Sequence, residues 1–191
     1  VPPAHTPGWE DRAVLWLLDQ CPPDYRSYAA WRRHPIALAW LAFGIAALAL
    51  SAPTKSDMQQ RDIMIVDDPA IRGRIDTLLA DQDWIPKAPH FIVFLGNNRR
   101  QRQIHDWTGI PFANDHLDAF FNAAVDGAIV LATFVQAAEL AGLGSCPISE
   151  IRNHAATIST LLELPDRVFP IAGLTLGYPA SKEPLSPRLA L

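Results

Sequence analysis

The spacing of apolar residues along the chain predicts strands and helices that alternate. Asp62–Val66 and His90–Leu95 are short runs of apolar residues bounded by Pro, Gly or Asp, as is typical of strands. A repeat of apolar residues at three- and four-residue steps predicts a long helix over about 116–143, ended by glycines. Val168–Leu176 predicts a late strand. This interleaving favours an α+β fold, in which helices surround one sheet.

Shorter sequence patterns predict the helices, loop and turn that lie between these elements. Asp68 can cap a helix that Pro69 opens, directly after the first strand. The polar stretch 97–103 predicts a loop or the start of a helix, and Cys146–Ile148 an extended turn or strand. A further helix is predicted over 150–164.

One segment bears on the choice between a soluble and a membrane protein. Residues 35–54 carry no charge, and Ile36–Leu50 is almost wholly apolar. A membrane-spanning helix needs about 20 such residues. This run barely reaches that length, is rich in alanine and opens with a proline. We therefore expect a helix buried on most sides, between subunits, with a membrane span as the alternative.

Charge and cysteine content indicate which partners and which cell compartment suit the protein. The net charge of −4 gives no electrostatic case for nucleic acid or an anionic membrane as partner. Cys21 and Cys146 are the only cysteines, which excludes a disulfide framework and favours a reducing cytoplasm. The first stretch lacks the pattern of a signal peptide, and the start at Val1 rather than Met indicates a trimmed sequence.

Familiar catalytic motifs are missing from the sequence. There is no G-x-S-x-G, H-E-x-x-H, Walker or Rossmann motif. Glu150 and His154 are interpreted as a surface pair. A loose polar group matches no metal-ligand template and is interpreted as solvated: His105, Asp106, Asp115, His116 and Asp118. Any difficult chemistry is therefore expected to belong to a cofactor rather than to side chains.

Three segments have the composition of a site for an anionic, amide-rich ligand. They are Arg26–Ser27, the polar loop Ser51–Gln60 after the apolar run, and Pro147–Arg152. In the third, backbone N–H groups at a helix start, with Arg152 one turn in, are typical of a phosphate site.

Taken in this order, the segments resemble the nitroreductase family of FMN enzymes. The resemblance is closest to its oxygen-insensitive NADPH nitroreductase and flavin reductase branch, and it runs from about residue 25 to the end of the chain. Family-like phrases recur in the expected order: Tyr25–Ala29, Ala52–Gln59, Gly142–Ser149, Leu162–Pro165, Leu176–Pro179 and Pro187–Leu189.

The resemblance implies a three-layer α/β sandwich with a mixed central sheet, forming an intertwined homodimer with two FMN sites at its interface. Residues 1–24 would be an N-terminal arm with a short helix, and residues 25–191 the FMN-binding domain. The resemblance assigns the FMN phosphate and ribityl chain to Arg26, Ser27 and Arg152. It also implies contacts with the flavin from the following residues: Thr54, Lys55, Ser56 and Gln59 along the ring or ribityl chain, Gln82 near the ring, and the backbone of Pro147, Ile148 and Ser149 at its N5 and O4 edge. Arg188 resembles a contact with the phosphate of NADPH.

The activity implied is a ping-pong reaction. FMN takes hydride from NADPH or NADH and passes electrons to nitroaromatics, quinones or similar flat acceptors, with no catalytic side chain required. The chain departs from the family at Tyr25 and Ala29, where basic residues are usual, and at Glu150, whose carboxylate would disfavour a nearby phosphate. These departures motivate an alternative, a degenerate member that binds or sequesters flavin without efficient turnover.

Overall fold

A computed structural model describes residues 35–181 of the chain. In chain order the elements are α3 (Pro35–Leu50), η2 (Lys55–Asp57), β1 (Arg61–Val66), α4 (Pro69–Leu78), η3 (Ile85–Lys87), β2 (His90–Asn97), α5 (Arg99–Thr108), α6 (Leu117–Leu140), β3 (Gly144–Ile148), η4 (Ser149–His154), α7 (Ala155–Leu161) and β4 (Val168–Gly177). The chain divides into two compact units, residues 1–41 and 42–191, and the fold below is that of the second. The boundary predicted between residues 24 and 25 lies outside the described residues.

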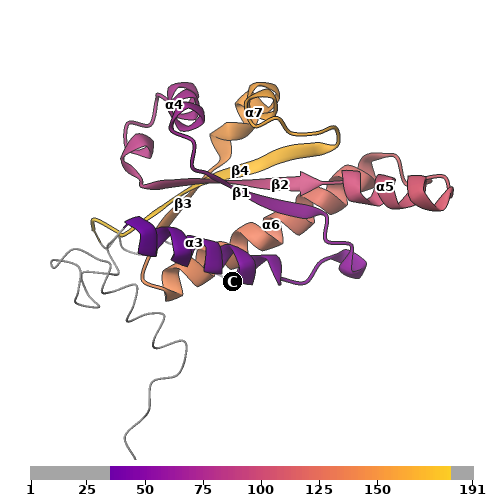
Figure 1. The fold of residues 1–191 in the computed structure, drawn as a ribbon, viewed down its shortest axis with the longest axis horizontal. Coiled ribbons are helices and arrows are strands. Elements are labelled where there is room, and N and C mark those ends of the chain that lie inside the picture. The colour runs from indigo at the N-terminus through magenta and orange to yellow at the C-terminus, as the bar shows by residue number, and fades with distance from the viewer. Residues whose placement is uncertain (1–34, 182–191) are drawn as a thin grey trace, which may run out of the picture. The chain divides into compact units, whose positions relative to one another are not determined.

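The second unit is built on a four-stranded sheet. Its strand order is β1-β2-β4-β3, and each of its three pairings is antiparallel. Helices α4 and α7 cover one face, and α6 lies across the other (Figure 1). The α+β class and the three layers are confirmed. The mixed sheet stays a prediction, because no parallel pair occurs among the strands that the structure describes.

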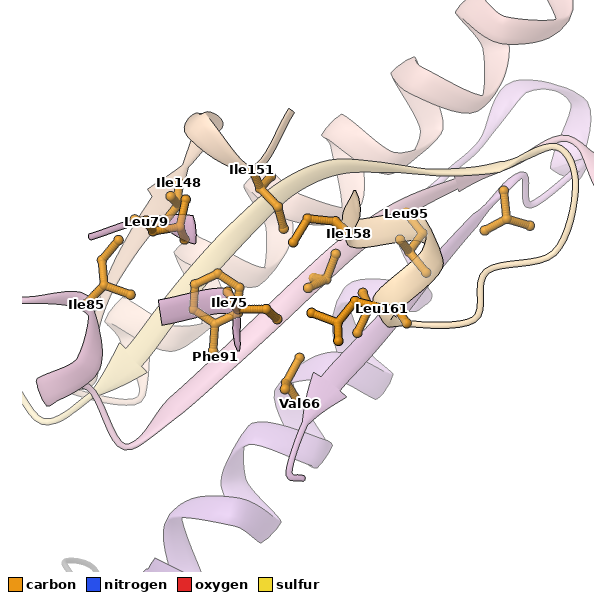
Figure 2. Close-up of a cluster of buried hydrophobic side chains, with 13 residues drawn as sticks. Val66, Ile75, Leu79, Ile85, Phe91, Leu95, Ile148, Ile151, Ile158 and Leu161 are labelled. Atoms are coloured by element: carbon orange, nitrogen blue, oxygen red, sulfur yellow. The ribbon is translucent and has the colours of Figure 1, made fainter. Parts of the chain in front are cut away.

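One layer of the core lies between the sheet and the helices α4 and α7. Side chains alternate between the two faces of a strand, so β2 directs Phe91, Val93 and Leu95 into this layer. Figure 2 shows Phe91 beside Ile75 of α4. The buried cluster comprises Val66, Ile75, Leu79, Ile85, Phe91, Val93, Leu95, Ile148, Ile151, Ile158, Leu161, Leu162 and Val168.

The other layer is the packing of α6 against the sheet. Phe134 is fully buried and meets Phe94 of β2 edge to face, with the ring centroids 5.4 Å apart and the rings at 79°. Gly127 lets the helix approach closely, since a Cβ there would lie 2.1 Å from Cδ1 of Ile171 and 3.3 Å from the carbonyl oxygen of Leu95. Helix α6 is thereby fixed against β2 and β4.

Helix α6 is also the one helix of the described residues that is long and apolar enough to cross a membrane. Its packing explains its composition, because its apolar face covers the sheet. It also buries two polar side chains, Asn122 and Asp126, which a lipid-facing helix would not carry without cost. Helix α6 therefore has the character of a core helix.

Helix α3 corresponds to the uncharged run, and its 16 residues are too few for the same test. From Ala42 onward, Ala42, Ile45 and Ala49 are buried, whereas Leu48 is 57% exposed. The sequence led us to expect a helix that is buried on most sides. Within one protomer it is not. Burial of its other face between subunits remains a prediction.

Most of the predicted elements are confirmed, with one difference. The polar stretch 97–103, predicted as a loop or the start of a helix, enters helix α5 at Arg99. The helix predicted over 150–164 is instead a 3₁₀ segment, η4, followed by the short α7. Tertiary contacts account for the tighter turn: Ile151 is fully buried in the core, and Arg152 donates from Nη1 to the carbonyl oxygen of Ile171 at 2.8 Å.

Candidate functional site

The loop between α3 and β1 holds the first group of predicted site residues. Its backbone is strained, because Ser56, Asp57 and Gln59 adopt φ values of 50°, 54° and 54°, in the left-handed region. The hydroxyl of Thr54 accepts from the backbone N–H of Gln59 at 3.1 Å and closes the loop. Such strain persists only where the surroundings hold the chain in place.

Asp126 of α6 is the group that holds this loop. Its side chain is fully buried, and its two oxygens accept from the backbone N–H of Lys55 at 3.2 Å and of Gln60 at 3.0 Å. Hydrogen bonds to an ionised acceptor are among the stronger ones in proteins. The sequence analysis missed Asp126, although a lone carboxylate within an apolar helix repeat was a signal that could have found it.

The side chain of Lys55 is tied to α6 as well. Its Nζ lies 3.1 Å from Oδ1 of Asn122 and 3.4 Å from Oδ2 of Asp118. The pKa of Asp118 is held below its usual value, first by the hydrogen bond from Asn114, then by that from Asn122, and also by Lys55. The contribution of this carboxylate to stability is therefore present at neutral pH and lost as pH falls through its lowered pKa.

A cavity of about 200 Å³ adjoins the loop, and Lys55, Gln60 and Asn122 are among the residues that line it. Small-molecule sites usually enclose about 300–1,000 Å³. Two larger cavities, of about 370 and 650 Å³, are lined in part by Arg102 and Arg167. None of the predicted site residues lines either of them. Within one protomer, the cavity beside the loop is therefore smaller than a usual small-molecule site.

The second group of predicted residues lies at the β3 edge of the sheet. Gln82 donates from Nε2 to Oε2 of Glu150, so the turn after α4 meets the start of η4. Ile148 is buried and precedes η4 without supplying a side-chain cap, whereas Pro147 and Ser149 are exposed. Pro147 and Ser149 are therefore exposed next to the residue, Glu150, that Gln82 contacts.

The structure does not bring the two groups together. Gln60 leads into β1 at one edge of the sheet, while Ile148 ends β3 at the other. Three inter-strand spacings separate these edges, or about 14 Å. The loop is also held by α6, which covers one face of the sheet, whereas Gln82 follows α4, which covers the other face (Figure 1). The loop group and the Gln82 group therefore cannot line one compact site in a single protomer.

The remaining predicted contacts, Arg26, Ser27 and Arg188, lie outside the described residues. Within residues 35–181, no group of three or more His, Cys, Asp or Glu side chains is arranged to hold a metal ion. Glu150, which was interpreted as half of a surface pair with His154, instead bonds Gln82.

The fold defines a class: α+β proteins in which helices cover both faces of one four-stranded antiparallel sheet (Figure 1). Comparison with known proteins gives the family. Residues 38–178 match the profile of the Nitroreductase family, and the chain belongs to that family.

Several characterised proteins are similar to this chain. An FMN reductase [NAD(P)H] of Bacillus subtilis is 35% identical over 170 residues, which cover 87% of this chain and 67% of that protein. An oxygen-insensitive NADPH nitroreductase of Salmonella typhimurium is 34% identical over 145 residues, covering 76% of this chain and 59% of that protein. The NADPH:FMN oxidoreductase of Vibrio harveyi, solved in complex with NAD⁺, has a TM-score of 0.72 at 28% identity, covering 79% of this chain and 62% of that one. This chain thus spans about three fifths to two thirds of the length of these relatives.

Proposed function

We propose that the protein is an FMN-dependent NAD(P)H oxidoreductase. It reduces nitroaromatics, quinones or similar small flat electrophiles in a ping-pong reaction. The proposal rests on membership of the nitroreductase family and on similarity to relatives named as FMN reductase and NADPH nitroreductase. When bound, FMN supplies the hydride and electron transfer that side chains cannot perform.

The donor groups of the chain fit FMN, whose ring edge and phosphate are rich in acceptors. Arg152 and the N–H groups at the start of η4 supply donors at one edge of the sheet. Thr54 and Ser56 supply hydroxyl groups, and Lys55 its side-chain amine, at the other edge. The protein would bind and orient the ring and exclude water, while Arg26, Ser27 and Arg188 remain predicted contacts.

A homodimer is part of the proposal, and the separation of the two groups is the observation that carries it. The loop is held by α6 on one face of the sheet, and about three strand spacings divide it from the start of η4 at the other edge. One FMN would therefore contact the loop of one protomer and the start of η4 of its partner. The exposed apolar residues of α6 suit a subunit interface: Leu117, Phe120, Phe121, Val125 and Leu140. We further propose a cytoplasmic location, in keeping with the free Cys146.

The first test is the absorption spectrum of the purified protein, before and after incubation with FMN. The protein should be yellow and should bind one FMN per protomer. Anaerobic addition of NADPH or NADH should bleach the flavin band, and a nitroaromatic or quinone should restore it. A protein that stays colourless after incubation with FMN contradicts the proposal. A bound flavin that neither nucleotide bleaches favours the degenerate flavin-binding alternative.

Subunit mixing tests the shared site. Lys55→Glu disables the loop and Arg152→Glu the η4 turn, so either variant alone should lose most of its FMN binding. When the two variants are unfolded and refolded together, half of the dimers are heterodimers. In each heterodimer one site receives both substituted groups, and the other site receives the unsubstituted loop of one subunit and the unsubstituted η4 segment of its partner. About a quarter of all sites should then bind FMN. If both groups served the same protomer's site, the mixture would bind no more than its parents.

A further inference from the structure

The contact between Gln82 and Glu150 joins two segments that lie 68 residues apart in the sequence. Both side chains are half-buried. An ionised carboxylate can only accept hydrogen bonds, so Glu150 must be met by the amide nitrogen of Gln82. The amide oxygen of Gln82 then points away from Glu150. The contact thereby fixes which polar atom Gln82 presents to its surroundings.

Within the part of the chain that the structure describes, no cationic side chain pairs with the charge of Glu150. Among the ion pairs of residues 35–181, none includes Glu150. Arg152, which lies two residues further along η4, directs Nη1 to the carbonyl oxygen of Ile171 instead. The η4 turn therefore carries a negative charge that its neighbouring arginine does not pair.

We propose that Glu150 is a positioning residue that lowers the reduction potential of the flavin. The inference rests on the proposed function, in which Gln82 and the Pro147–Ser149 turn face the ring. A ring reduced by hydride has gained two electrons and one proton, so it carries one more negative charge than the oxidised ring. An unpaired carboxylate beside the ring disfavours that charge and makes the reduced ring a stronger donor.

The size of the effect follows from Coulomb's law. At an effective dielectric constant near 20, a unit charge about 10 Å away changes an equilibrium by about ten- to twentyfold. Glu150 should therefore weaken the binding of reduced FMN, relative to oxidised FMN, by about tenfold. For a two-electron couple a tenfold change corresponds to about 30 mV.

The test compares the FMN-loaded wild type with Glu150→Gln and with a matched control, Glu139→Gln. Glu139 is exposed near the end of α6, so its replacement removes the same charge away from the η4 turn. Anaerobic titration against redox dyes gives the midpoint potential, and flavin fluorescence gives the affinity for oxidised FMN. We expect Glu150→Gln to raise the potential by about 30 mV, with the control unchanged.

A second variant separates charge from hydrogen bonding. Gln82→Met keeps the carboxylate and removes its partner, so the potential should remain low while the affinity for oxidised FMN falls. Equal potentials for wild type and Glu150→Gln, both loaded with FMN, would overturn this inference and leave the proposed function standing. A wild type that binds no FMN would overturn both.

Discussion

Replacing Asp126 with alanine is expected to abolish FMN binding and to lower the free energy of unfolding by about 3–5 kcal/mol. The carboxylate accepts two backbone N–H groups of the strained loop, at Lys55 and Gln60. Without it these donors lose a charged acceptor, and each unsatisfied buried donor costs about 1–3 kcal/mol. Urea unfolding measures the stability, and fluorescence quenching of added FMN measures the binding.

Two further substitutions serve as controls for Asp126→Ala. Asp126→Asn keeps one oxygen but turns an amide nitrogen toward the second donor, so both losses should be intermediate. Asp83→Ala removes an exposed carboxylate that pairs with Lys87 on the surface, and should change stability by less than about 1 kcal/mol. FMN affinity of Asp126→Ala equal to that of the wild type would show that the loop needs no anchor on α6.

Phe134→Ala is expected to lower the free energy of unfolding by about 3–5 kcal/mol. The ring is fully buried and packs edge to face on Phe94, so its removal leaves a cavity between α6 and the sheet. For a domain of this size, the midpoint of thermal unfolding should fall by about 10 °C. FMN retention should fall as well, because the same helix carries Asp126.

The control for Phe134 is Phe134→Leu, which keeps most of the side-chain volume. It should cost less than half as much as the alanine variant, because the residual cavity is smaller. Calorimetry measures both midpoints. If the alanine variant unfolds within about 2 °C of the wild type, the packing of α6 on β2 is not the contact that holds this layer.

Much of the fold could be predicted because local patterns and tertiary structure agree. The short apolar runs of β1 and β2 match a partly exposed edge strand and a buried central strand. The three- and four-residue steps in α6 match its buried face. The 3₁₀ turn of η4 could not be predicted this way, because the burial of Ile151 and the bond from Arg152 are tertiary contacts.

The candidate site could be predicted as a set of residues but not as an arrangement. The family resemblance indicated Thr54, Gln82 and Arg152, yet spacing along a chain says nothing about which sheet edge each occupies. The bond from Gln82 to Glu150 and the anchor at Asp126 join segments more than 60 residues apart. Such contacts depend on how the helices pack on the sheet, so no local pattern encodes them.

The constraint on the loop before β1 has a kinetic consequence. Three consecutive or near-consecutive left-handed residues, Ser56, Asp57 and Gln59, leave the backbone few other conformations that keep its hydrogen bonds. If this loop is already rigid before a ligand binds, it loses little conformational entropy on association. The association rate constant should then depend on diffusion and orientation rather than on ordering of the loop. Differences in affinity among variants would therefore lie mainly in the dissociation rate constant.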